Sequence, residues 1–178
     1  MNMEGSFSVQ LAELMPLIRE TLAAGQTATI RIKGISMEPF LINGRDSVEL
    51  AAPGDRRIRV GDLLLFERAD LSFALHRVCR VYPDESFDIV GDNQQIRDLG
   101  IPRSAVIARV PRVWRDGKEI RCDAGFWRSL MTFYMRARLR FPRIARRCMR
   151  LIQMTAHVCR DPAVIVRRLK RMGEKHEQ

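Results

Sequence analysis

GISMEPF, residues 34–40, places a serine at the end of an alternating, strand-like run and follows it with a turn. Two later segments of the chain supply a histidine, His76, and an aspartate, Asp92. A serine hydroxyl is a poor nucleophile until a base takes its proton, and a carboxylate can hold that base in place. The order serine, histidine, aspartate therefore predicts Ser36 as a nucleophile, His76 as its base and Asp92 as an orienting group.

The charge distribution along the chain indicates one folded domain with a basic tail. The chain has 178 residues, of which 46% are hydrophobic and 29% charged, and this is typical of a globular protein with one sizeable core. Residues 1–125 contain 17 lysines and arginines against 18 acidic residues, whereas residues 126–178 contain 14 against 3. The net charge of +10 therefore comes from the tail, which favours an anionic partner such as a membrane, a nucleic acid or an acidic protein.

Cysteine usage and the N-terminal sequence predict a cytoplasmic protein. The four cysteines, Cys79, Cys122, Cys148 and Cys159, are widely spaced, which favours reduced thiols over a disulfide framework or a zinc site. The first residues lack the basic and apolar regions of an export signal, and no apolar run approaches the roughly 18 to 20 residues that span a bilayer. We expect neither a cofactor nor a metal, and at most a peripheral position at the inner face of a membrane.

Hydrophobic periodicity predicts an α+β fold with a compact, mostly antiparallel β domain. Between residues 8 and 24 an amphipathic helix is expected, with an apolar face that holds Leu11, Leu14, Met15, Ile18 and Leu22. Strands are expected at residues 27–33, 47–51, 63–66, 73–81, 87–90 and 105–113. The predicted organisation is an N-terminal helix over residues 1–26, a β domain over residues 27–125 and a basic helical tail over residues 126–178.

The tail carries an apolar stripe between its arginines. Leu130, Ala137, Ile144, Leu151 and Val158 recur seven residues apart, and prolines at 142 and 162 divide the region into two or three helices. One interpretation is helices that pack on the β domain with their arginines in solvent. The other is a peripheral anchor in an anionic membrane interface, with the aromatic residues Phe126, Trp127, Phe133, Tyr134 and Phe141. Nucleic acid is not the expected partner, because basic charge alone is not sufficient for it.

Four ordered motifs resemble those of a family of serine peptidases. They are SMEP at residues 36–39, GD at residues 61–62 before an apolar strand, HRV at residues 76–78 and GDN at residues 91–93. In this order and at these separations they resemble the superfamily of signal peptidase I and the LexA-like autoproteases, over residues 27–113. The resemblance implies a β-rich catalytic domain that hydrolyses a peptide bond with an attacking serine.

The resemblance also assigns roles to the candidate residues. Ser36 stands in the place of the nucleophile. His76 stands where the endoplasmic-reticulum type of signal peptidase has histidine and where bacterial signal peptidases and LexA-like proteins have lysine. Asp92 matches the carboxylate of the histidine type, and Asp98 is a second candidate with less motif support. Gly34 replaces a serine that helps many signal peptidases bind the oxyanion, so backbone N–H groups, including that of Ser36, would take this role.

The remaining predicted site residues surround the serine. We place the oxyanion site and the substrate pocket at Gly34, Met37 and Pro39, and the resemblance implies a shallow pocket for Ala or Gly. Core packing is an alternative role for Met37 and for Phe40. A turn serine bonded to its own backbone is the alternative for Ser36, and the three candidate side chains could each be ordinary strand or turn residues.

We therefore expect a serine endopeptidase that removes a leader from a peptide or protein precursor. Two alternatives stay open. The first is a binding protein that keeps the peptidase fold without the chemistry and recognises extended peptides by strand addition. The second is a LexA-like regulator that cleaves itself, for which Ala24-Gly25 and Ala124-Gly125 are the candidate bonds. No helix-turn-helix pattern precedes the peptidase region, which argues against the regulator.

Overall fold

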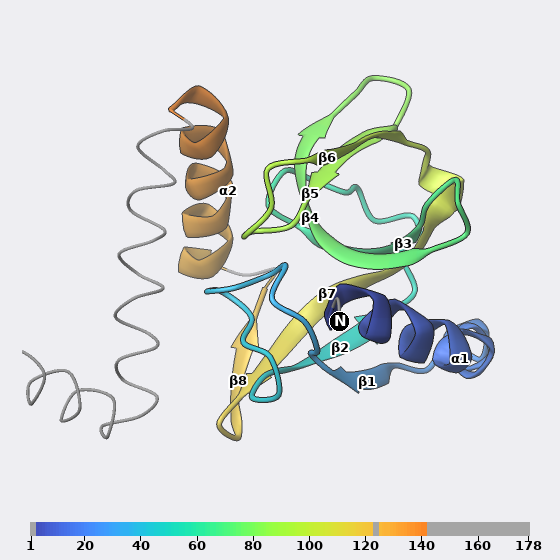
Figure 1. The fold of residues 1–178 in the computed structure, drawn as a ribbon. Coiled ribbons are helices and arrows are strands. Elements are labelled where there is room, and N and C mark those ends of the chain that lie inside the picture. The colour runs from blue at the N-terminus through green and yellow to red at the C-terminus, as the bar shows by residue number, and fades with distance from the viewer. Residues whose placement is uncertain (1–2, 123–124, 142–178) are drawn as a thin grey trace, which may run out of the picture.

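The chain forms an antiparallel sheet with helices before and after it (Figure 1). The structure is a computed structural model that describes residues 3–122 and 125–141. Its helices are α1 (Met3–Ala23), α2 (Gly125–Arg140) and a short 3-10 helix at Arg103–Ala105. Its strands are β1 (Ala28–Arg31), β2 (Ser47–Ala51), β3 (Leu63–Glu67), β4 (Phe73–Val81), β5 (Phe87–Val90), β6 (Arg97–Ile101), β7 (Val106–Arg115) and β8 (Lys118–Arg121). The predicted α+β class with a mostly antiparallel sheet is confirmed.

The sheet has the strand order β1-β2-β7-β3-β4-β5-β6, and β8 pairs with β7 outside this path. The long strand β7 joins the two halves, because Val113 pairs with Val48 of β2 while Ala108 pairs with Leu65 of β3. In Figure 1 the strands β3 to β6 curl together in one half, and β1, β2, β7 and β8 lie in the other. The segments that follow β1 and β5 therefore belong to different halves of the sheet.

Helix α1 shares the largest hydrophobic core with the sheet. Its buried face holds Leu11, Met15, Ile18 and Leu22, which cluster with side chains of β2, β3, β4 and β7. Leu14, which we expected on the same face, is 45% exposed. The other four positions already recur at alternating four- and three-residue steps, so they fill the contact stripe and leave Leu14 at its edge.

A second core lies in the curled half of the sheet. It contains Ile58, Leu64, Phe66, Ala74, Val78, Phe87, Ile89 and Val106. Successive residues of a strand point to opposite faces, and accordingly Leu63 and Leu65 of β3 belong to the first core while Leu64 and Phe66 belong to the second. The same alternation sends the neighbouring residues His76 and Arg77 of β4 to different faces.

Helix α2 packs on the sheet through methionines rather than through the predicted seven-residue stripe. Met131 and Met135 are 1% and 0% exposed, whereas Leu130 and Phe133 are 36% and 70% exposed. Leu130, the first position of the stripe, therefore lies at the surface, and Ala137, the next position, is half-buried. The rest of the stripe, and the further helices predicted within residues 142–178, lie outside the described residues.

Most of the strands have the predicted positions. The bounds of β2, β4 and β5 agree with the sequence-based expectation, and those of β1, β3 and β7 differ from it by one or two residues at an end. Sequence reasoning misses β6, RDLGI, and β8, KEIR. Each of these strands is short and rich in charged residues, so no hydrophobic period identifies it.

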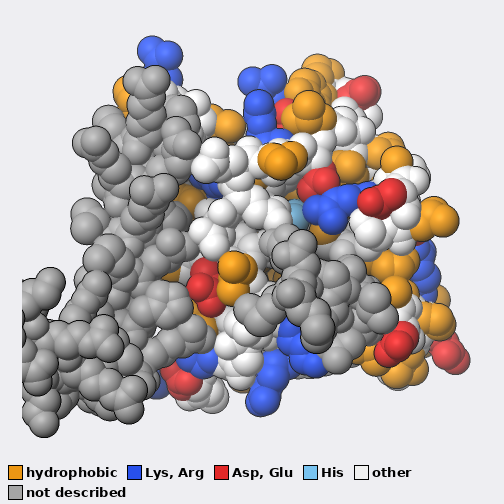
Figure 2. Space-filling view, in the orientation of Figure 1, with side chains coloured by type: hydrophobic (Ala, Val, Ile, Leu, Met, Phe, Trp, Pro, Cys, Tyr) orange, Lys and Arg blue, Asp and Glu red, His pale blue; other side chains and the backbone are white. Residues whose placement is uncertain are grey.

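The described surface mixes both signs of charge. Figure 2 shows Lys and Arg side chains next to Asp and Glu side chains, with hydrophobic groups between them. Neither α1 nor α2, the two long helices of the described part, combines the length and the hydropathy that crossing a membrane requires.

Candidate active site

Ser36 lies in the loop between β1 and β2, and a buried carboxylate ties this loop to the sheet. Asp46 is fully buried, and it accepts hydrogen bonds from the Ile42 backbone N–H at 2.9 Å and from the Arg45 guanidinium at 2.7 Å. Arg115 of β7 donates to the same carboxylate at 3.1 Å. Burial raises the pKa of the Asp46 carboxyl, but the bonds from Arg45 and Ile42 lower it below its usual value. The loop is therefore anchored by a charged group that stays ionised.

The backbone of Ser36 is bonded to the turn between β5 and β6. The Asn93 N–H donates to the Ser36 carbonyl at 2.8 Å, and the Asn93 side-chain amide donates to the Ile35 carbonyl at 3.2 Å. Gly91 touches the same carbonyl so closely that a Cβ at this position would lie 2.8 Å from it. A glycine is required here because any larger residue would push the serine segment away. The structure thus brings the serine and the GDN motif together.

The Ser36 side chain is half-buried at the boundary between surface and core. Gly34 has a φ of +85°, which glycine adopts readily, and it turns the chain out of β1. Ile35 is then 41% exposed, and Met37 is 3% exposed. Within the described residues, no hydrogen bond involves the Ser36 hydroxyl, so the alternative of a turn serine bonded to its own backbone is not observed there.

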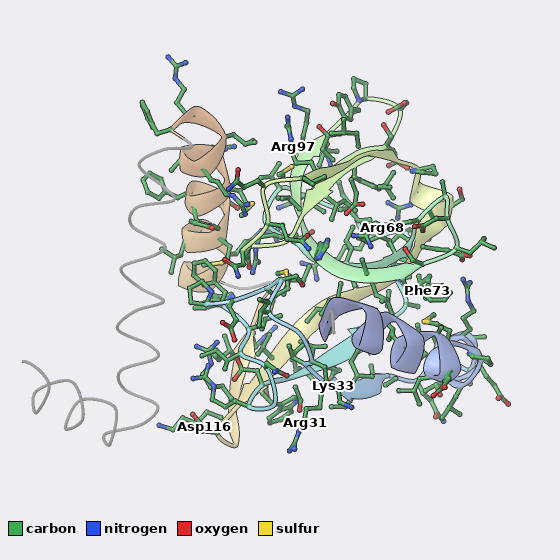
Figure 3. All side chains as sticks on the ribbon, viewed as in Figure 1. Arg31, Lys33, Arg68, Phe73, Arg97 and Asp116 are labelled. Carbon is green, nitrogen blue, oxygen red and sulfur yellow. The ribbon has the colours of Figure 1, made fainter. Side chains whose placement is uncertain are left out.

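His76 and Asp98 are in contact. His76 lies on β4 and is 3% exposed, and its Nδ1 is 3.4 Å from Oδ2 of Asp98 on β6. The two strands are separated by β5, where Ile89 pairs with Asp98. Arg68, at the end of β3, donates to both oxygens of Asp98 at 2.6 and 3.0 Å, and it lies beside this half of the sheet in Figure 3. Asp98 is therefore held by a cation on one side while it faces the imidazole on the other.

The electrostatics of Asp98 suit an orienting carboxylate. Burial raises the pKa of the Asp98 carboxyl, but hydrogen bonds from His76 and Arg68, together with the charge of Arg68, lower it to about 2. The group is therefore ionised near neutral pH and can only accept hydrogen bonds. A carboxylate next to Nδ1 favours the tautomer with the proton on Nδ1, which leaves Nε2 of His76 as the basic nitrogen.

Asp92 is bound to Arg77 and not to His76, which corrects the predicted role of this residue. Oδ1 and Oδ2 of Asp92 lie 3.0 and 3.2 Å from Nε of Arg77, and Oδ2 lies 2.8 Å from Nη2. Both side chains are almost fully buried. Strand alternation explains the result, because His76 and Arg77 are adjacent on β4 and must point to opposite faces. Of the two aspartates that the sequence offered, Asp98 is the one that reaches the histidine.

The predicted pocket residues have different surroundings. Met37 belongs to the core shared with α1, so core packing, the alternative role, is the one observed. Pro39 is half-buried and follows a cis peptide bond. Phe40 is half-buried as well, and its ring contacts Tyr134 of α2 at 4.9 Å between centroids and Trp127 at 6.4 Å. The segment after the serine is therefore packed between the sheet and α2, and Met37 does not line an open pocket.

Sequence reasoning misses two arginines of the site. Arg77 follows His76 directly and could have been recognised as the partner of a buried acid. Arg68 leaves no such signal, because it is 30 residues from Asp98 in the chain and meets it only through the strand order. Among the described residues no group of three or more possible metal ligands is present.

The comparisons with known proteins do not assign the chain to a family. No family model matches the chain, and no curated protein matches it.

Proposed function

We propose that this chain is a serine endopeptidase of the signal-peptidase-like type, in which Ser36 is the nucleophile, His76 the base and Asp98 the orienting carboxylate. The contact between His76 Nδ1 and Asp98 carries the proposal. It is supported by the attachment of Ser36 to the turn at Gly91–Asn93, because β6, which carries Asp98, begins soon after this turn. One hairpin thus holds both the serine backbone and the carboxylate.

The proposed reaction uses these groups in the order of a serine peptidase. Ser36 Oγ forms a bond to the scissile carbonyl carbon while Nε2 of His76 takes the hydroxyl proton. His76 then gives this proton to the leaving amine as the C–N bond breaks. Asp98 stabilises the imidazolium that exists between the two steps. Water releases the acyl group by the same sequence, in which His76 again removes a proton.

The oxyanion would be bound by backbone groups of the serine loop. Gly34 has no side-chain hydroxyl to offer, so the backbone N–H of Ser36 is the candidate donor, as expected from the sequence. Removing one such donor costs about 2.7 to 4 kcal/mol in other enzymes. The fixed loop, held by Asp46, keeps such a donor in place without reorganisation during the reaction.

Labelling with a fluorophosphonate tests the proposal. The wild-type chain should form a covalent adduct at Ser36, whereas Ser36→Ala and His76→Ala should not react. Ser104→Ala is the matched control, because Ser104 is an exposed serine outside the site. A library of leader-like peptides with small residues at the cut then identifies the substrate. A folded wild-type chain that neither labels nor cleaves would instead support a binding protein, in which the edge strand β1 pairs with an extended peptide.

We also propose that the outer face of α2 contacts an anionic membrane surface. Phe133 and Phe141 are 70% and 54% exposed, and Leu130 beside them is 36% exposed. The helix contains four arginines and no acidic residue. An exposed apolar stripe with flanking cations is typical of a helix that lies in a lipid interface.

Flotation with liposomes tests this contact. Anionic liposomes should carry the wild-type chain, neutral liposomes should not, and Phe133→Ser should weaken the flotation. Leu71→Ser is a suitable control, because Leu71 is 73% exposed in the turn between β3 and β4, away from α2. Equal flotation with both kinds of liposome, or equal loss in both variants, would exclude the contact.

A further inference from the structure

A cavity of about 440 Å³ lies between α2 and the segment that leads into β3. Four arginines line it, Arg57, Arg59, Arg128 and Arg136, together with the hydroxyl-bearing Thr132. No acidic residue is among its lining residues, all of which belong to the described part of the chain. The cavity is separate from the candidate active site, since Ser36, His76 and Asp98 are not among its lining residues.

Backbone geometry explains why the arginines converge. On α2, Arg128, Thr132 and Arg136 are spaced by four residues, so they share one face of the helix. On the facing segment, Ile58 is 4% exposed and points into the second core. Its neighbours Arg57 and Arg59 are both exposed and so point the other way, toward the cavity. Two pairs of guanidinium groups therefore face a common space.

The walls of the cavity are held together by close packing. A Cβ on Gly61 would lie 3.2 Å from the Thr132 backbone nitrogen, so the helix rests directly on this glycine. Thr132 Oγ1 also donates to the Val60 carbonyl at 3.1 Å. These contacts fix α2 against the segment before β3, so the arginines are brought together before any ligand arrives.

The charge around the cavity is strongly positive. Asp62 is the acidic neighbour, and one of its oxygens lies 3.8 Å from the Arg128 guanidinium. The other Asp62 oxygen accepts a hydrogen bond from the Arg59 backbone N–H at 2.9 Å. Among the described residues, the Asp62 carboxylate thus lies beside a cavity that is lined by four guanidinium groups. Guanidinium groups repel one another, and an anion with several oxygens relieves this repulsion by accepting paired hydrogen bonds.

We propose that this arginine cavity binds the phosphate group of an organic phosphate. The planar fork of N–H donors on each arginine matches phosphate oxygens. The volume lies in the range of small-molecule sites, and it exceeds what a lone phosphate ion needs. The apolar lining residues Val60 and Val81 suit a carbon skeleton attached to the phosphate. The same chemistry is offered by a soluble phosphate ester and by a lipid headgroup.

Two probes distinguish these sources, and both use the full chain. Calorimetric titration with glycerol 3-phosphate, at constant ionic strength set with chloride, measures the soluble source. Co-sedimentation with phosphatidylcholine vesicles, with and without phosphatidic acid, measures the lipid source. The site variants are Arg128→Gln/Arg136→Gln and, on the exposed opposite wall, Arg57→Gln/Arg59→Gln. The control is Arg31→Gln/Lys33→Gln, which removes the same charge next to β1, far from α2 in Figure 3.

Each site variant should weaken binding of at least one probe by about tenfold or more, since each removes two charge-assisted contacts. The control should change that binding by less than about twofold. Loss with glycerol 3-phosphate supports a soluble ligand, and loss only with vesicles that contain phosphatidic acid supports a lipid headgroup. The proposal is overturned if the wild type binds neither probe, or if the site variants and the control behave alike. A Phe133→Ser chain should still bind glycerol 3-phosphate, which keeps this site distinct from the outer face of α2.

Discussion

Replacing Asp92 by asparagine should destabilise the fold by about 3 kcal/mol. The Asp92 carboxylate accepts three short contacts from Arg77, between 2.8 and 3.2 Å, and each side chain is at most 2% exposed. Asparagine keeps the shape and one acceptor, but it removes the negative charge opposite the buried guanidinium, which also donates to the Gly61 carbonyl at 2.9 Å. Breaking a buried ion pair by removing one charge typically costs about 3 to 5 kcal/mol, and the isosteric change belongs at the lower end of this range.

Urea denaturation followed by circular dichroism measures this loss. With a slope of about 2 kcal/mol per molar urea, 3 kcal/mol lowers the midpoint by roughly 1.5 M. The double variant Arg77→Met/Asp92→Leu should recover much of the loss, because apolar side chains of similar volume often replace a buried ion pair without cost. The cycle formed with the two single variants isolates the coupling between the two residues.

A stable Asp92→Asn chain would refute the roles assigned here to the two aspartates, in which Asp92 holds Arg77 and Asp98 orients His76. An Asp92→Asn chain within about 0.5 kcal/mol of the wild type does not contain the buried ion pair described here. If that stable chain also failed to label at Ser36, Asp92 would be the orienting carboxylate and Asp98 would lose the role. Labelling of the folded variant must therefore be measured together with its stability.

Asp98→Asn should slow fluorophosphonate labelling of Ser36 by a factor on the order of 10³ to 10⁴, as when a triad carboxylate becomes an amide, and labelling at the wild-type rate would remove Asp98 from the site. The lowered pKa of Asp98, about 2 against 3.8, means that the unfolded chain binds its proton first as the pH falls. Asp98 therefore contributes about 2 kcal/mol of stability above pH 4, which disappears between pH 4 and 2, and Asp98→Asn should lack this part of the urea-midpoint change with pH. Gly91→Ala should cost about 1 to 3 kcal/mol in urea and reduce labelling, because its Cβ would lie 2.8 Å from the Ser36 carbonyl, and an unchanged midpoint would contradict that contact. Met135→Ala should cost about 2 to 5 kcal/mol while Phe133→Ala, on the exposed face, stays within about 0.5 kcal/mol, and equal costs would show that α2 packs by another face.

The sequence predicts those strands whose side chains carry a hydrophobic pattern between clear turns. The strand β4 is found with its observed bounds, because apolar side chains on both of its faces, such as Leu75 in the first core and Ala74 and Val78 in the second, form one run between turns. The strands β6 and β8 carry no such pattern, since both are short, contain charged residues and are mainly exposed. Their pairing with β5 and β7 is a tertiary effect, which single-sequence periodicity does not contain. The same holds for α2, where Met131 and Met135 form the buried face and Leu130, the first position of the seven-residue stripe, is exposed.

The candidate site shows the consequence of missing one strand. Ser36, His76 and the GDN motif are all identifiable from the sequence, and the structure connects the serine backbone to Gly91 and Asn93. The choice between Asp92 and Asp98 needed the position of β6. Once β6 pairs with β5, Asp98 lies opposite Ile89, whose side chain belongs to the second core. His76 shares that face by strand alternation, whereas Asp92 lies in the turn, within reach of Arg77.

His76 and Arg77, which are adjacent on β4, bind different aspartates, and the two pairs have different roles. Arg77 binds Asp92, which lies between the glycine that touches the Ser36 carbonyl and the asparagine that donates to it. The buried ion pair therefore fixes the turn that positions the serine, although it touches no reacting atom. His76 binds Asp98, which is less buried and remains ionised. In the proposed mechanism, the buried ion pair keeps the geometry of this turn fixed while a proton moves on the other face of the same strand. Asp92→Asn should consequently reduce labelling because Ser36 is misplaced. A lower reaction temperature, which restores folding, should restore part of the labelling of this variant. The labelling of Asp98→Asn should stay low at the lower temperature.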